Sequence, residues 1–240
     1  MINDATRSNA PGTYSAILFD LDNTILDFHR CERNAILKAV TFCDLPIENH
    51  TLASFLEAYE SANAEYWRRR SEFNPHDMVE KSFSDALDAL SLDTAPARCL
   101  SEVYRRVFLT EVSFEPGALE TIRSLSSTFR LGIITNGTSP AQEKRVRSAR
   151  IERFFEEILV SDAVGYTKPD PQIFAIALER MHLQPHRVLY VGDSIRNDYQ
   201  GAFAAGIDFC YYNRTGIPVE DGAAPTYSIR TISRLCKIVV

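Results

Sequence analysis

Two aspartates separated by a single residue, Asp20 and Asp22, are the side chains of this sequence best placed to do chemistry. They come at the end of an uninterrupted apolar run, residues 16–19, which predicts a buried parallel strand. Ligands of open α/β sheets bind beyond the carboxyl ends of the strands, where both carboxylates would emerge. One carboxylate could act there as a nucleophile and the other could transfer a proton. A turn or a strand cap would use the same residues, so the pair alone does not decide between chemistry and structure.

Polar residues also follow the later apolar runs. Thr135 and Asn136 follow one run and could donate hydrogen bonds to an oxyanion, although a polar turn has the same composition. Lys168 lies in a loop with two prolines, and a lysine there could offset repulsion between carboxylates and hold a phosphoryl oxygen. Asp193 and Asp198 follow a further run, where an N-cap or a helix-dipole partner is the structural alternative.

The strand ends of one parallel sheet lie along the same edge, so these side chains are expected to converge there. Asp20, Asp22, Asp193 and Asp198 would then gather about four negative charges, which is costly unless a cation lies among them. Oxygen ligands without histidine or cysteine favour a hard ion, most readily Mg²⁺. The sequence therefore predicts a magnesium site among these carboxylates.

The apolar runs alternate with amphipathic helical patterns. After the first run, further runs at residues 131–134, 158–160, 188–191 and 209–212 predict strands. This alternation predicts an α/β fold, a Rossmann-like doubly wound parallel sheet.

A long helical stretch interrupts this alternation. Four amphipathic patterns without a convincing strand predict an all-helical cap domain, residues 28–113, inserted just after the first strand. The catalytic core would then comprise residues 14–27 and 114–240, and residues 1–13 would form a flexible tail. An insertion at this place could cover the predicted site.

Composition limits the class of protein. Of 240 residues, 45% are hydrophobic and 24% charged, as in an ordinary soluble globular protein. A formal net charge of −6 without a long basic run argues against polymeric nucleic acid or a membrane as partner. Five scattered cysteines without a Cys-x-x-Cys pair predict reduced thiols rather than disulfides or zinc ligands. The sequence has neither a signal-like segment nor an apolar segment of 18 residues, so we expect a cytoplasmic protein. We expect it to be a monomer or a homodimer.

Four motifs occur in order along the chain: Asp-x-Asp-x-Thr at residues 20–24, Thr-Asn-Gly at 135–137, Lys-Pro at 168–169 and Gly-Asp-Ser-x-x-Asn-Asp at 192–198. In order and spacing they resemble the motifs of the haloacid dehalogenase superfamily of phosphohydrolases. The resemblance extends from about residue 15 to residue 240. The helical insertion matches the cap that many members carry after their first strand. The combination is much more specific than any single motif.

The resemblance implies a catalytic role for each matching residue. Asp20 would be the nucleophile that forms an aspartyl-phosphate. Asp22 would protonate the leaving oxygen and then activate water. Thr135, Asn136 and Lys168 would hold the transferring phosphoryl group. Such chemistry depends mainly on positioning and charge neutralisation, which this set of residues can supply.

The resemblance also implies a set of Mg²⁺ ligands. These are Asp20, the backbone carbonyl of Asp22 and Asp193, with Asp198 nearby or bonding through a water molecule. The resemblance thus predicts a Mg²⁺-dependent phosphomonoesterase whose partner is a small-molecule phosphate ester.

The second aspartate separates branches of the superfamily. Dehalogenases lack an acid at the position of Asp22, because displacing a halide needs no proton donor, so Asp22 favours a phosphatase. A phosphomutase, a sugar-phosphate phosphatase and a phosphoglycolate phosphatase remain alternatives. A non-catalytic module that binds a phosphorylated ligand is a further alternative, but such a module should have lost Asp20 or Asp22.

Finer details resemble the branch that contains bacterial pyrimidine 5′-nucleotidases. They include residues 19–28, 134–137 and 165–171. The resemblance implies a 5′-nucleotidase acting on nucleoside monophosphates. One position departs from that branch: Ser82 stands where a cap arginine usually precedes the phenylalanine matching Phe83.

Four aromatic residues in and next to the cap could stack on a nucleobase: Phe28, Tyr66, Trp67 and Phe83. The same residues would equally suit the buried stripe of an amphipathic helix. The sequence leaves both roles open.

Overall fold

The computed structural model describes residues 14–47, 49–69, 72–219 and 222–239, so the predicted tail lies outside the described residues. The chain divides into two compact units. The first, here called the core unit, comprises Met1–Phe28 and Val112–Val240, and the second, the helical unit, comprises His29–Glu111.

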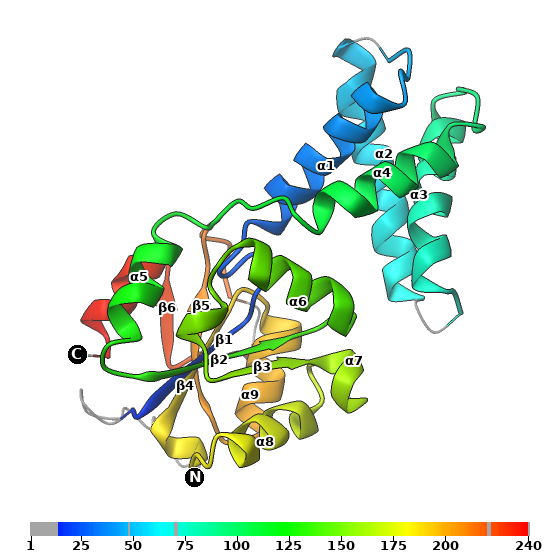
Figure 1. The fold of residues 1–240 in the computed structure, drawn as a ribbon. Coiled ribbons are helices and arrows are strands. Elements are labelled where there is room, and N and C mark those ends of the chain that lie inside the picture. The colour runs from blue at the N-terminus through cyan, green and yellow to red at the C-terminus, as the bar shows by residue number, and fades with distance from the viewer. Residues whose placement is uncertain (1–13, 48, 70–71, 220–221, 240) are drawn as a thin grey trace. The chain divides into compact units, whose positions relative to one another are not determined.

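An all-parallel sheet forms the centre of the core unit (Figure 1). Within the described residues it has six strands in the order β3-β2-β1-β4-β5-β6. The strands are β1 (Ala16–Phe19), β2 (Arg130–Thr135), β3 (Glu157–Val160), β4 (Val188–Gly192), β5 (Asp208–Tyr212) and β6 (Tyr227–Ile229). The predicted α/β fold class is confirmed. The short edge strand β6 was not predicted.

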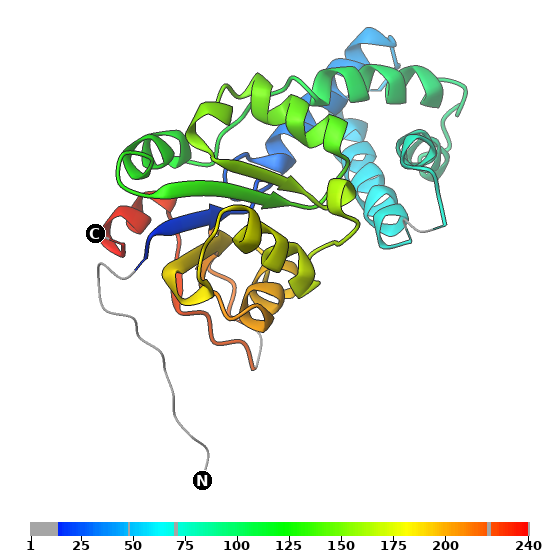
Figure 2. The same cartoon turned by 60° about the horizontal axis from the view of Figure 1, so that its bottom comes forward.

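Helices cover both faces of this sheet. Figure 2 shows one layer of helices on each side of the strands. One face packs on α5 (Ala118–Leu125) and α6 (Ser139–Ser148), and the other packs on α8 (Pro171–Arg180) and α9 (Gln200–Ala204). Shorter elements complete the unit: α7 (Ser161–Val164), η1 (Glu152–Phe154), η2 (Pro185–Arg187), η3 (Ile195–Tyr199) and η4 (Ile232–Lys237). Because both faces are covered, β1 is apolar at every position.

The register of the central strands places the polar residues that follow them at one edge. Phe19 pairs with Ile133 of β2 on one side and with Val191 of β4 on the other. The backbone N–H of Asp20 then donates to the carbonyl of Val191 at 2.8 Å. The next residues of all three strands therefore emerge together, as the parallel arrangement predicts.

The two linkers to the helical unit pair with each other inside the core unit. Leu26 forms an antiparallel bridge with Phe114. The N–H of Asp27 donates to the carbonyl of Ser113 at 2.9 Å. The chain thus leaves and re-enters the core unit through two hydrogen-bonded neighbours.

A buried carboxylate, that of Glu115, ties this linker pair to the sheet. It accepts hydrogen bonds from the Tyr212 hydroxyl at 2.7 Å and from Arg214 Nη1 at 3.0 Å. Arg214 also forms an ion pair with Asp27 of the other linker, at 3.2 Å. Burial raises the pKa of Glu115 above its ordinary value, against the opposing effects of Tyr212 and Arg214. These contacts offset much of the desolvation that the carboxylate suffers.

The helical unit contains four helices within its described residues, and Figure 1 shows them as α1 to α4. Their apolar stripes meet in one core. The helices are α1 (Phe28–Phe42), which begins with the last residue of the core unit, α2 (Asn49–Arg68), α3 (Pro75–Ala89) and α4 (Ala97–Phe108). In the described part of the chain, no helix combines the length and apolar character needed to cross a membrane.

Cys43 and Cys99 form a disulfide between the loop after α1 and helix α4. The prediction that all five cysteines are reduced is wrong for these two. Residues 56 positions apart in sequence meet only in the folded helical unit, and no local spacing pattern reports such a contact. Cys31, Cys210 and Cys236 are free thiols, as expected.

We predict that Tyr212→Phe lowers the free energy of unfolding of the core unit by about 1–3 kcal/mol, because buried Glu115 loses a hydrogen-bond donor. Urea denaturation followed by circular dichroism measures this change. Tyr166→Phe is the matched control, since this exposed tyrosine should tolerate the loss of its hydroxyl. Equal stability of both variants would contradict the role given to the Tyr212–Glu115 bond.

Candidate active site

Lys168 lies at the centre of the site, bonded to two aspartates. Its Nζ lies 2.6 Å from Asp20 Oδ1 and 2.7 Å from Asp198 Oδ1. All three side chains are almost inaccessible to solvent, with exposed fractions of 3%, 9% and 1% for Lys168, Asp20 and Asp198. Burial at this level requires charges to be paired, and this lysine pairs with two.

Asn136 holds the backbone of Lys168. Its Nδ2 donates to the Lys168 carbonyl at 3.1 Å, and its Oδ1 accepts from the Lys168 N–H at 2.9 Å. Both ends of the amide are thereby used to fix the loop. The sequence suggested that Asn136 binds phosphate, whereas its side chain here positions the lysine.

Tyr190, on β4, completes the surroundings of the lysine. Its hydroxyl accepts from Lys168 Nζ at 3.0 Å and lies 3.1 Å from both the Ile134 carbonyl and Asp198 Oδ1. Sequence reasoning missed this residue because it lies inside an apolar run. A hydroxyl within a buried strand is the one signal that could have pointed to it, since buried tyrosine hydroxyls usually find a partner.

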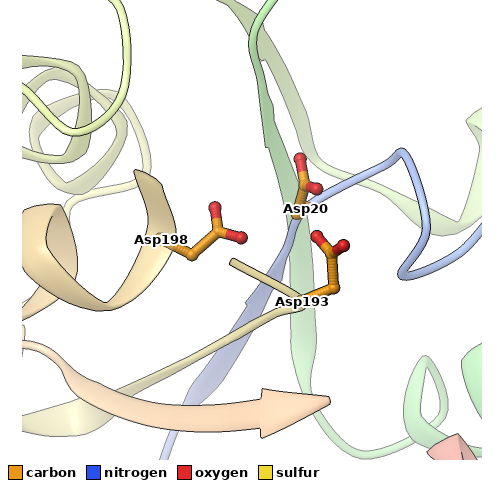
Figure 3. Close-up of side chains that lie close together, drawn as sticks. All are labelled: Asp20, Asp193 and Asp198. Carbon is orange, nitrogen blue, oxygen red and sulfur yellow. The ribbon is translucent and has the colours of Figure 1, made fainter. Parts of the chain in front are cut away.

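Three carboxylates from two segments meet beside Lys168 (Figure 3). Asp20 follows β1, Asp193 follows β4, and Asp198 lies on the π-helical turn η3. One oxygen from each carboxylate lies within 4.8 Å of the other two. This all-oxygen donor set suits a hard divalent cation such as Mg²⁺.

The carboxylates of the cluster differ in how many of their oxygens are already hydrogen-bonded. Both oxygens of Asp198 are engaged, Oδ1 with Lys168 and Oδ2 with the Ser194 N–H at 3.0 Å. Asp20 is bonded to Lys168 through Oδ1. A cation held here would therefore meet Asp20 and Asp193 more directly than Asp198.

The electrostatics of the cluster also favour a cation. Burial raises the pKa of Asp20 to about 7, Lys168 opposes this, and Asp198 and Asp22 add to it. Burial, together with the charges of Asp20 and Asp198, raises the pKa of Asp193 to about 8. Burial lowers the pKa of Lys168, but the two carboxylates outweigh it and raise that pKa above its ordinary value. One lysine thus lies among three carboxyl groups, so the cluster has more acidic than basic groups.

Gly192 lies directly against the Asp198 carboxylate. A Cβ on this glycine would overlap the Asp198 carboxylate, so the Gly-Asp pair at the end of β4 leaves room for that side chain. Ser194 begins the turn by accepting from the Asn197 N–H at 3.1 Å, as an N-cap does.

Asp22 points to a different group of residues. Its Oδ1 accepts from Arg145 Nη1 and its Oδ2 accepts from Gln142 Nε2 at 2.9 Å. Gln142 Nε2 also lies 2.8 Å from the hydroxyl of Thr135, which is buried at the end of β2. Neither Gln142 nor Arg145 was predicted as a site residue. Their spacing of three residues places both on one face of α6, but solvated polar residues commonly have the same spacing.

The four aromatic residues suggested for specificity lie in different surroundings. The Phe28 ring lies 5.7 Å from Arg145 Cζ within the core unit. In the helical unit Tyr66 donates to Asp85 at 2.7 Å, Trp67 is 39% exposed, and Phe83 is fully buried in the helical core. Phe83 thus has a packing role in this structure.

Ser82 precedes Phe83 and is also buried. Its hydroxyl donates to the Met78 carbonyl one turn earlier, at 2.7 Å. The position where the nucleotidase branch usually has an arginine is therefore occupied by a small side chain bonded to its own helix.

Comparison with known proteins identifies the family. Residues 17–212 match the model of the haloacid dehalogenase-like hydrolases. The HAD-hydrolase YfnB of Bacillus subtilis is 32% identical over 94% of this chain and 95% of its own length. Its magnesium-bound crystal structure superposes with a TM-score of 0.81, covering 94% of this chain and 98% of that one.

Two further relatives carry names that specify a substrate. The pyrimidine 5′-nucleotidase YjjG of Escherichia coli is 26% identical, covering 91% of this chain and 95% of its own length. The glyceraldehyde 3-phosphate phosphatase of Methanothermobacter thermautotrophicus is 30% identical, covering 82% and 85%.

A haloacid dehalogenase also shares the fold. The L-2-haloacid dehalogenase of Xanthobacter autotrophicus has a TM-score of 0.74 at 18% identity, covering 94% of this chain and 98% of that one. The motifs at the strand ends, the parallel sheet and the match along most of the sequence agree: this chain belongs to the haloacid dehalogenase-like hydrolase family.

Proposed function

We propose that this protein is a Mg²⁺-dependent phosphomonoesterase that works through an aspartyl-phosphate on Asp20. The observation that carries the proposal is the pairing of a buried Asp20 carboxylate with Lys168, beside Asp193 and Asp198. A nucleophile held next to a fixed cation suits phosphoryl transfer, which requires positioning and neutralisation of charge more than covalent assistance.

In the first step an oxygen of Asp20 attacks phosphorus, and the bond between phosphorus and the ester oxygen breaks. Asp22 gives its proton to the departing oxygen, so that an alcohol leaves. Lys168 offsets charge on the phosphoryl oxygens, and the Thr135 hydroxyl hydrogen-bonds to one of them. The carbon skeleton of the substrate leaves as the alcohol, and phosphate stays on Asp20.

In the second step water attacks the phosphorus of the aspartyl-phosphate. Asp22, now ionised, takes a proton from that water, and the bond between phosphorus and Asp20 breaks. Inorganic phosphate leaves, and both aspartates regain their starting states. The two carboxylates thus divide the work between nucleophile and proton carrier, as two residues on one loop can do.

Mg²⁺ is the proposed cofactor, held by the carboxylates of Asp20 and Asp193 and by the backbone carbonyl of Asp22, with Asp198 nearby. When bound, it would supply positive charge to the transferring phosphoryl group. The donor set and the raised pKa values of two of its carboxylates support this. A magnesium-bound structure of the relative YfnB adds support from outside this chain.

Nucleoside monophosphates are the proposed substrates. Support comes from the motif details and from the relative named as a pyrimidine 5′-nucleotidase. Small sugar phosphates are the second candidate, because a relative of higher identity is named as a glyceraldehyde 3-phosphate phosphatase. Ser82, where nucleotidases usually carry arginine, fits this second candidate better.

Release of inorganic phosphate by the purified protein tests both candidates. The panel comprises nucleoside monophosphates, glyceraldehyde 3-phosphate, phosphoglycolate and 2-chloropropionate, each with Mg²⁺ and with EDTA. Mg²⁺-dependent release led by the nucleotides supports the first candidate, and release led by a three-carbon phosphate supports the second. Chloride release from 2-chloropropionate without phosphate release would overturn the phosphatase assignment.

We predict that Asp20→Asn lowers kcat by at least about a thousandfold, because the amide cannot act as the nucleophile. The substitution is nearly isosteric and leaves Lys168 paired with Asp198, so the thermal unfolding midpoint should stay close to that of the wild type. Asp162→Asn, at an exposed aspartate of the same unit, is the control and should keep full activity. Near-normal turnover by Asp20→Asn would rule out the covalent route.

We predict that Mg²⁺ raises the unfolding midpoint more at about pH 8.5 than at about pH 6. Carboxyl groups with raised pKa values hold protons in the folded state that the unfolded chain has released. Stability without metal therefore falls as pH rises through the pKa values of about 7 and about 8. Below these pKa values protons compete with Mg²⁺ for the carboxylates, and above them this competition ends.

Differential scanning fluorimetry measures this shift, with sodium chloride of equal ionic strength as the reference. Asp193→Asn is the control variant and should lose most of the Mg²⁺ response at both pH values. An equal rise at both pH values would contradict binding at these carboxylates.

A further inference from the structure

We propose that Gln142 and Arg145 of α6 are positioning residues that fix the Asp22 carboxylate for proton transfer. The inference rests on the proposed function, since it assumes that Asp22 carries the proton. It assigns a catalytic consequence to two side chains outside the four sequence motifs.

The two side chains hold both oxygens of Asp22. Arg145 Nη1 donates to Oδ1, and Gln142 Nε2 donates to Oδ2 at 2.9 Å. Arg145 Nη1 also donates to Gln142 Oε1 at 3.2 Å, which ties the two holders together. A carboxylate held through both oxygens cannot rotate about its terminal bond without breaking one contact.

Gln142 also connects Asp22 to Thr135, a residue proposed to bind the phosphoryl group. Its Nε2 lies 2.8 Å from the Thr135 hydroxyl and 3.1 Å from the Asn136 carbonyl. One amide therefore sets the distance between the proton carrier and the end of β2. Displacement of Gln142 would disturb both residues.

Arg145 is buried, although its charged partner is partly exposed. Its side chain is 1% exposed, whereas its partner Asp22 is 24% exposed at the open edge of the sheet. Burying a guanidinium is unfavourable unless it is well paired, and a surface position on α6 would avoid that cost. The buried arginine instead directs its charge toward the accessible carboxylate.

The local fold is shaped to admit this arrangement. Gly137, in the loop before α6, has φ of +142°, a conformation that other residues rarely adopt. A Cβ there would come within 3.0 Å of Gln142 Cγ. On the other side, the Phe28 ring lies 5.7 Å from the Arg145 guanidinium, within range of a cation–π contact. Glycine in the Thr-Asn-Gly motif thus leaves space for the Gln142 side chain.

The expected consequence depends on the leaving group. General acid catalysis contributes about 10²–10⁴-fold where the leaving oxygen needs a proton. An alkyl phosphate needs one, whereas p-nitrophenolate leaves without one. A misplaced Asp22 should therefore slow the alkyl ester selectively, and a general loss of structure should slow both esters alike.

The experiment compares kcat/KM for p-nitrophenyl phosphate and for an alkyl phosphate, because kcat/KM reports steps up to release of the leaving group. The variants are Asp22→Asn, Arg145→Met and Gln142→Leu. We expect Arg145→Met and Gln142→Leu each to lose at least about tenfold more on the alkyl ester than on p-nitrophenyl phosphate. In the Asp22→Asn background, Arg145→Met should cause little further selective loss, since residues acting as a unit are not additive.

Arg147→Met is the matched control on the same helix, because Arg147 is exposed and pairs only weakly with Glu143, at 3.3 Å. It should leave both substrates unchanged. Unfolding midpoints show which variants are folded. If Arg145→Met does not fold, the substrate selectivity of Gln142→Leu tests the positioning role.

The possible results distinguish a failure of the positioning role from a failure of the proposed function. If Asp22→Asn is selective and the folded Arg145 and Gln142 variants are not, the positioning role is wrong and the proposed function stands. If Asp22→Asn itself shows no selectivity, the proton role of Asp22 is wrong and the inference falls with it. If the wild type hydrolyses neither these esters nor any phosphate ester of the substrate panel, both are overturned.

Discussion

The pairing of Lys168 with Asp20 and Asp198 is the interaction on which the rest of the site depends. Three charged side chains are buried together, and each would be unfavourable without the others. The surrounding contacts serve this arrangement: Asn136 fixes the lysine backbone, Tyr190 accepts from its ammonium group, and the turn after β4 delivers Asp198. One lysine lies among three carboxyl groups, and this imbalance supports the proposed metal ion.

A second group, centred on Asp22, lies beside the first and has a different character. Asp20 is nearly inaccessible and bonded to a lysine, whereas Asp22 is partly exposed and held by an arginine and an amide. Residues i and i+2 of a strand would share one side, but β1 ends at Phe19, and the two carboxylates enter distinct environments in the loop that follows. That difference is what a nucleophile and a proton carrier require.

The strands and the motif residues could be predicted because their signals are local. Apolar runs ending in polar residues located β1, β3 and β4, and the parallel arrangement then predicted that Asp20, Lys168 and Asp193 would converge. The roles of Gln142 and Arg145 could not be predicted, since polar residues on an amphipathic helix are normally solvated. The Cys43–Cys99 disulfide could not be predicted for a related reason. It depends on how the helices pack, which the spacing of residues in the sequence does not encode. Strand β6 was too short for its pattern to stand out.

The pairing of the two linkers has a consequence for how such a protein can change over evolutionary time. Because Leu26 and Phe114 are bridged, the helical unit is inserted at a single point of the core unit, with its entry and exit side by side. The sheet register and the pairing of Lys168 then place no demand on the length or sequence of what lies between the linkers. Mutations can therefore accumulate in the insertion while the residues at the strand ends keep their geometry. The two units of one chain can change in sequence almost independently.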